Sequence, residues 1–163
     1  MRLLLIGDIV GKPGRQITAR AVPGLRVEQE LDLVVANAEN AAGGSGLTPP
    51  IYYELIEAGV DCVTLGDHVY RRREIYPVMK NESRIVRPAN YPNDAPGRDH
   101  AQIRTKSGLR TAVISLLGRV FMPPVDCFFR AVDRVLRDLP SDVKLILVDF
   151  HAEATSDKQV LGR

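Results

Sequence analysis

The sequence predicts an α/β fold built around a parallel sheet, and three observations support this. Short apolar runs rich in Val, Leu and Ile occupy residues 2–6, 33–38, 61–65 and 143–150. Runs of this length and composition are typical of parallel strands that are buried on both faces. Stretches with helical signals separate the runs, and polar clusters follow them. The length of 163 residues suffices for one core, so we expect residues 1–163 to form a single domain.

Proline and glycine mark the helices of the first half. A helix is expected to start near Pro13, because proline fits the first helical turn, and residues 23–24 (Pro-Gly) are expected to break or restart it. Thr48 is a suitable N-cap for a second helix, and Gly59 is a suitable C-terminal stop. A short helix over residues 71–80 is expected after the third strand.

The pattern changes in the second half of the chain. Prolines within residues 88–96 predict an irregular stretch. Residues 101–105 and 109–116 alternate better and flank Ser-Gly at 107–108, which indicates a β-hairpin. A helix is expected over residues 126–139, before the last strand. An antiparallel element therefore follows the parallel one.

Composition and local motifs exclude several classes of protein. The chain has 22 basic and 20 acidic residues, so its bulk charge does not indicate nucleic-acid binding. Cys62 and Cys127 are expected to be structural. No run is long enough for a signal-peptide core or a membrane span, so we expect a cytoplasmic protein without a membrane partner. Residues 7–13 are one residue short of P-loop spacing, and Pro13 replaces the magnesium-binding Ser or Thr, which excludes a nucleoside triphosphatase.

Residue types that bind metals or transfer protons follow the apolar runs. They are Asp8, Glu39, Asn40, Asp67, His68 and His151. Because the carboxyl ends of parallel strands share one edge of an open α/β sheet, we expect these side chains to meet there. Carboxylates, a carboxamide and imidazoles are ligands that transition metals accept, so the sequence predicts a metal site and a hydrolase.

Most of these residues also have a structural interpretation. Asp8 could cap a helix or a loop. Glu39 could accept hydrogen bonds from the glycine-rich loop that follows it, and a lone histidine such as His68 is usually structural, although it suits proton transfer near neutral pH. One arginine of residues 71–73 could bind a substrate phosphate, or the three could form a solvated helix start. His100 has no comparable context and is expected at the surface.

Five motifs resemble one known family. They are GDIVGKPGR at 7–15, NAENAAGGSG at 37–46, LGDH at 65–68, LLGRVFM at 116–122 and VDFHAEATSDKQ at 148–159. The chain is identified by them as similar to the YmdB-like bacterial metallophosphoesterases, a branch of the calcineurin-like phosphoesterase superfamily. The resemblance implies an α/β/β/α sandwich, a dinuclear iron or manganese centre, and hydrolysis of a small phosphodiester. The family's best-known substrates are 2′,3′-cyclic nucleotides, which are opened at the 2′ side.

The resemblance also implies roles for individual residues. Two divalent or trivalent metal ions would be held by Asp8, Glu39, Asn40, Asp67 and His151. Glu39 would bridge the ions, with Asp8 and Asn40 on the first. Asp67 and His151 would hold the second. His68 would protonate the leaving oxygen after attack by a metal-bound hydroxide.

Two departures from the family pattern leave alternatives open. Asp67 stands where the family carries Asn, which lowers the net charge of the centre by one unit. The family's Gly-Thr-His-Thr-His segment would follow beyond Arg163, so we expect a sandwich that is incomplete at its C-terminus, in a chain that is part of a longer polypeptide or a truncated product. A regulatory metal- or nucleotide-binding protein, or an inactive fragment, is the alternative function. A homo-oligomer is also left open.

Overall fold

The first half of the chain forms the predicted parallel sheet. The structure is a computed structural model that describes residues 1–163. In spatial order the sheet contains β1 (Leu3–Ile6), β2 (Leu33–Asn37), β3 (Cys62–Thr64) and β4 (Ile85–Val86), and all neighbours are parallel. Leu33 and Val35 of β2 pack toward a second sheet, whereas Val34 packs toward the helices. Both faces of β2 are therefore buried, as a continuous apolar run predicts.

Helices cover the outer face of this sheet. They are α1 (Gly11–Glu28), α2 (Pro49–Glu57) and α3 (Tyr76–Asn81), with a 3-10 turn, η1 (Arg73–Ile75), before α3. α2 follows Thr48 and ends before Gly59, whose φ of +100° is one that glycine adopts without strain. The helix expected over 71–80 begins later, at the 3-10 turn.

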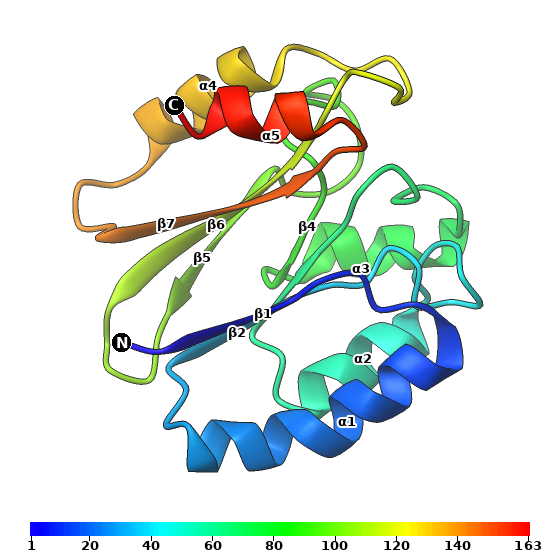
Figure 1. The fold of residues 1–163 in the computed structure, drawn as a ribbon, viewed down its shortest axis with the longest axis vertical. Coiled ribbons are helices and arrows are strands. Elements are labelled where there is room, and N and C mark those ends of the chain that lie inside the picture. Colours follow the sequence, from blue (N-terminus) through cyan, green and yellow to red (C-terminus); the bar gives the residue numbers. More distant parts are fainter.

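A second sheet packs against the inner face of the first. It contains β5 (His100–Arg104), β6 (Arg110–Leu117) and β7 (Leu145–His151). β5 and β6 form the predicted hairpin, and β7 is parallel to β6. The outer face of this second sheet is covered by α4 (Phe128–Asp138) and α5 (Thr155–Leu161). Figure 1 shows the resulting α/β/β/α layers, which confirm the expected sandwich.

The expected break of the first helix at Pro23 was wrong, because α1 continues through that residue. Val22 is buried, and Arg26 donates a hydrogen bond of 2.8 Å from Nε to the Gly59 carbonyl oxygen. The same guanidinium pairs with Asp61. These tertiary contacts hold the second half of the helix in place and override the local cost of proline.

The structure also differs from the expectations for β4, β1 and His100. β4 was not predicted, because two residues carry no periodic signal and prolines follow closely. Leu3 and Leu5 of β1 are exposed, since β1 lies at the edge of its sheet. His100 is not free at the surface; its ring is 23% exposed and its Nδ1 lies 2.9 Å from Asp99 Oδ1.

No helix of the structure has the length and apolarity needed to cross a bilayer.

Tyr52 provides a test of the core. Its side chain is fully buried and its hydroxyl has no hydrogen-bond partner, and burial raises the pKa of Tyr52 to about 12. Tyr52→Phe is expected to raise the free energy of unfolding by about 1 kcal/mol, because it removes an unsatisfied buried polar group. Urea denaturation measures this change. Tyr53→Phe, which alters an exposed tyrosine bonded to Glu82, should change stability little. A less stable Tyr52→Phe variant would contradict the expectation.

Candidate metal centre

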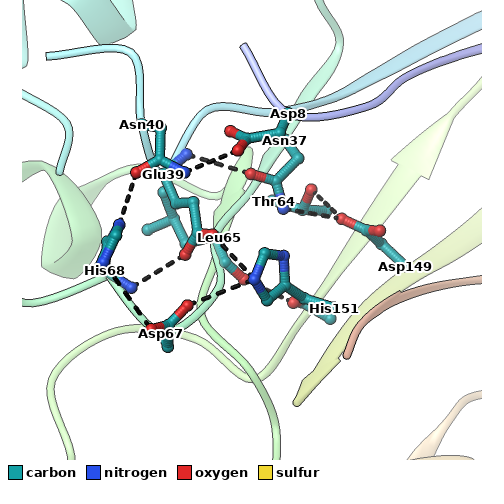
Figure 2. Close-up of polar contacts among 11 residues, drawn as sticks. Asp8, Asn37, Glu39, Asn40, Thr64, Leu65, Asp67, His68, Asp149 and His151 are labelled. Carbon is teal, nitrogen blue, oxygen red and sulfur yellow. Dashed lines mark hydrogen bonds and ion pairs between the residues drawn. The ribbon is translucent and has the colours of Figure 1, made fainter. Parts of the chain in front are cut away.

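Polar side chains from both sheets converge at one end of the strands, as Figure 2 shows. The loops after β1, β2 and β3 contribute Asp8, Glu39, Asn40, Asp67 and His68, and β7 contributes His151. All of them were expected at the edge of a single sheet, which was wrong for His151. β7 pairs with β6 in the second sheet, so His151 reaches the cluster from the opposite side.

Three of these side chains form a compact group of possible metal ligands. One ligand atom from each of Glu39, Asp67 and His151 lies within 4.8 Å of the others. His151 Nε2 lies 3.1 Å from Glu39 Oε1 and 3.3 Å from Asp67 Oδ1. Two carboxylate oxygens and one imidazole nitrogen thus point to a common position, and this is a donor set that first-row transition metals accept.

The charge balance of this group favours a cation. Glu39 is only 1% exposed, its Oε1 makes no hydrogen bond, and its Oε2 accepts one of 2.9 Å from the backbone N–H of His68. Burial raises the pKa of Glu39 above its usual range, and the nearby Asp67 raises it further. Neither carboxylate forms an ion pair with a lysine or an arginine. A bound cation would compensate this buried negative charge, so the residues present fit a metal ion.

Asp8 and Asn40 lie beside this group and are hydrogen-bonded to each other. Asn40 Nδ2 donates to Asp8 Oδ2 at 2.7 Å, and Asn40 Oδ1 lies 2.5 Å from His68 Nδ1. The contacts form a chain from Asp8 through Asn40 to His68, visible in Figure 2. Asn40 thereby fixes the ring of His68 through Nδ1 and leaves Nε2 available, 3.8 Å from Asp67 Oδ2.

Three polar residues that were not predicted, Asn37, Thr64 and Asp149, connect the strands that carry the site. Asp149 Oδ2 accepts hydrogen bonds from Thr64 Oγ1 at 2.5 Å and from Asn37 Nδ2 at 3.4 Å, so it ties β7 to β2 and β3. Asn37 Oδ1 in turn accepts a hydrogen bond of 3.1 Å from the backbone N–H of Glu39. The alternation of a strand could have revealed Asp149, since it lies two residues before His151 and faces the same side.

The other candidates do not belong to the cluster. Arg71, Arg72 and Arg73 are exposed, and Arg72 Nε donates a hydrogen bond of 3.3 Å to the Ser45 carbonyl oxygen. Cys62 is fully buried between the sheets, and burial raises the pKa of its thiol to about 12, which supports its structural role.

Gly66 keeps the space beside Glu39 open. A Cβ atom at this position would lie 2.7 Å from Glu39 Cδ and 2.8 Å from Oε1. Gly66→Ala should therefore displace the carboxylate and weaken metal binding by about 10-fold or more, as loss of supporting contacts around metal ligands does. Titration calorimetry with Mn²⁺ measures this. Gly7→Ala is the matched control, because a Cβ atom there meets nothing within 4 Å. Equal Mn²⁺ affinities in the two variants would show that Gly66 does not shape the site.

A family profile, a curated relative and solved structures all match nearly the whole chain. A family profile described as YmdB-like protein matches residues 4–163. The chain is 41% identical to the 2′,3′-cyclic-nucleotide 2′-phosphodiesterase of Bacillus subtilis (strain 168) over 99% of its length, and it spans 61% of that relative. A crystal structure of a hypothetical protein from Thermus thermophilus matches with a TM-score of 0.91 and 42% identity, over 99% of this chain and 62% of that one. The crystal structure of a novel phosphatase from Mycoplasma pneumoniae matches with a TM-score of 0.86 and 30% identity, over 97% and 57%.

Proposed function

We propose that this chain, which belongs to the YmdB-like protein family, hydrolyses small phosphodiesters with the help of bound metal ions. The observation that carries the proposal is the buried Glu39 carboxylate. It converges with Asp67 and His151 on a common position and has no lysine or arginine to balance its charge. The substrate class comes from the name of the Bacillus subtilis relative, which matches 99% of this chain.

Glu39, Asp67 and His151 would hold one metal ion in this proposal. Asp8 and Asn40 lie next to Glu39 and would serve a second ion, which Glu39 would share. Iron and manganese suit this mixture of oxygen and nitrogen ligands. When bound, such ions act as Lewis acids on a phosphoryl group and lower the pKa of water.

His68 would supply the proton that the leaving oxygen needs. Its Nδ1 faces Asn40 Oδ1, so the ring is held in one orientation and its Nε2 stays free for substrate. Asp67 Oδ2 lies 3.8 Å from Nε2, on the side of the ring that faces away from Asn40. A histidine placed in this way can protonate an alkoxide as the phosphorus–oxygen bond breaks.

We propose a 2′,3′-cyclic nucleotide as the substrate. The test is incubation of the Mn²⁺-loaded protein with 2′,3′-cyclic AMP, followed by chromatography of the products. We expect 3′-AMP, because the ring would open at the 2′ side. A protein that binds Mn²⁺ but forms no nucleotide monophosphate would instead support the alternative, a regulatory metal- or nucleotide-binding protein.

A further inference from the structure

The end of β4 points toward the metal centre, although no functional residue was predicted there. β4 is parallel to β3, so the segment that follows Val86 leaves the sheet at the same edge as Asp67 and His68. Pro88 forms a bridge with Ser115, and the backbone N–H of Ala89 donates a hydrogen bond of 2.8 Å to the Ser115 carbonyl oxygen. The segment therefore passes from the first sheet to the second before it reaches Tyr91.

Two buried polar side chains fix the shape of this segment. Asn90 is fully buried; its Nδ2 donates to the Leu117 carbonyl oxygen and its Oδ1 accepts from the Leu117 N–H, both at 2.8 Å. Arg87 is also buried and only 3% exposed. Its guanidinium donates to backbone carbonyl oxygens of Pro88, Pro92 and Ala95. Tyr91 thus sits on a segment that is held rigid before any ligand binds.

The ring of Tyr91 packs against Tyr70, but its hydroxyl has no hydrogen-bond partner in the chain. The ring meets Tyr70 edge to face, with centroids 5.4 Å apart and an interplanar angle of 81°. Asn90, the residue before Tyr91, is bonded to Leu117, which pairs with His151 in the second sheet, so Tyr91 lies at the level of the cluster. Burial raises the pKa of Tyr91, and the carboxylates of Asp67 and Glu39 raise it further, so the phenol stays protonated.

Tyr91 also lines a hollow in the protein surface. A hollow of about 350 Å³ is lined by Tyr91 together with residues that include Asn93, Arg130 and Arg134. Arg134 is occupied by Asp99 and by the Ala89 carbonyl oxygen, whereas Arg130 is exposed. A ligand that extends from the metal centre past Tyr91 would find room there and two exposed side chains of opposite charge, Arg130 and Asp126.

We propose that the Tyr91 hydroxyl donates a hydrogen bond to a phosphate oxygen of the ligand at the metal centre. The residue is then a substrate-binding residue, and the adjoining hollow holds the part of the ligand beyond the phosphate. The inference rests on the proposed function for its ligand class, a phosphate ester. A protonated phenol has one proton to donate, and an anionic phosphate oxygen is a strong acceptor for it.

The test compares Tyr91→Phe with the wild-type chain, both loaded with Mn²⁺. Phenylalanine keeps the ring contact with Tyr70, so Mn²⁺ content and unfolding temperature should not change. Titration calorimetry with 3′-AMP and with inorganic phosphate should show binding weakened by about 10-fold or more, which is typical for loss of a hydrogen bond to a charged group. Tyr53→Phe alters a tyrosine on α2 whose hydroxyl is bonded to Glu82, and it should bind both probes as the wild type does.

The outcomes separate this inference from the proposed function. If Tyr91→Phe binds phosphate and 3′-AMP with wild-type affinity, the role of Tyr91 is wrong, even if the protein hydrolyses 2′,3′-cyclic AMP. If the variant binds both probes weakly and neither protein has any hydrolytic activity, the binding role of Tyr91 holds and the proposed function fails. Weaker binding of 3′-AMP alone would contradict the contact with phosphate.

Discussion

Replacing Glu39 with glutamine is expected to weaken Mn²⁺ binding by more than about 100-fold and to abolish phosphodiesterase activity with it. Loss of groups that only support metal ligands already costs about 10–100-fold in affinity, and Glu39 is the most buried carboxylate of the cluster. Glutamine keeps the shape of the side chain and removes its charge. Elemental analysis and titration calorimetry measure the loss.

The same substitution should stabilise the metal-free protein. Because burial raises the pKa of Glu39, the folded state holds the proton more tightly than the unfolded state does. Ionisation of Glu39 therefore lowers stability as pH rises above the ordinary value of 4.5, and this cost is absent below that value. Metal-free Glu39→Gln should unfold at a higher temperature than metal-free wild type at pH 7, and the difference should vanish at about pH 4.

Two results would contradict this account of Glu39. One is wild-type Mn²⁺ content in Glu39→Gln, which would show that the carboxylate is not a ligand. The other is a metal-free variant that is less stable than wild type at pH 7. Glu57→Gln, at the exposed end of α2, is the matched control and should change neither metal binding nor the pH dependence of stability.

Replacing His68 with alanine is expected to reduce hydrolysis of 2′,3′-cyclic AMP by about 10²–10⁴-fold, the usual contribution of a positioned general acid. The ribose alkoxide that leaves in this reaction is strongly basic and needs a proton. The p-nitrophenolate that leaves from bis(p-nitrophenyl) phosphate is weakly basic and departs without one. The loss on this second substrate should therefore be much smaller, and steady-state kinetics on both substrates measures the difference.

Controls separate proton donation from a structural effect of His68. Mn²⁺ content should stay close to that of wild type, because the side chain of His68 is outside the group formed by Glu39, Asp67 and His151. His100→Ala removes a histidine that pairs with Asp99, and it should leave both rates near the wild-type values. Equal losses on the two substrates in His68→Ala would rule out the role as an acid.

The position of Glu39 and Asp67 at the ends of strands could be predicted from the sequence, because that prediction needs only local information. Glu39 and Asp67 each follow an apolar run, and parallel strands bring their ends to one edge. His151 was predicted as a site residue but assigned to the wrong sheet, since the partner of a strand depends on contacts distant in sequence. Tyr91 was missed because β4, the strand before it, is two residues long.

Other features depend on side-chain geometry that no local pattern encodes. The hydrogen bonds that join Asp8, Asn40 and His68 require particular rotamers in three separate loops. The continuity of α1 through Pro23 depends on Arg26, whose partners lie more than thirty residues away in sequence. In both cases tertiary contacts decide between arrangements that the local sequence leaves equally possible.

In the proposed function, hydrolysis requires a cation held by Glu39, Asp67 and His151. The most direct test is a stepwise titration of metal-free protein with Mn²⁺, in which bound metal and the rate of 2′,3′-cyclic AMP hydrolysis are measured on the same samples. We expect no hydrolysis without metal and a rate that rises with metal occupancy until the sites are full. Hydrolysis by the metal-free protein, or full occupancy without hydrolysis, would contradict it.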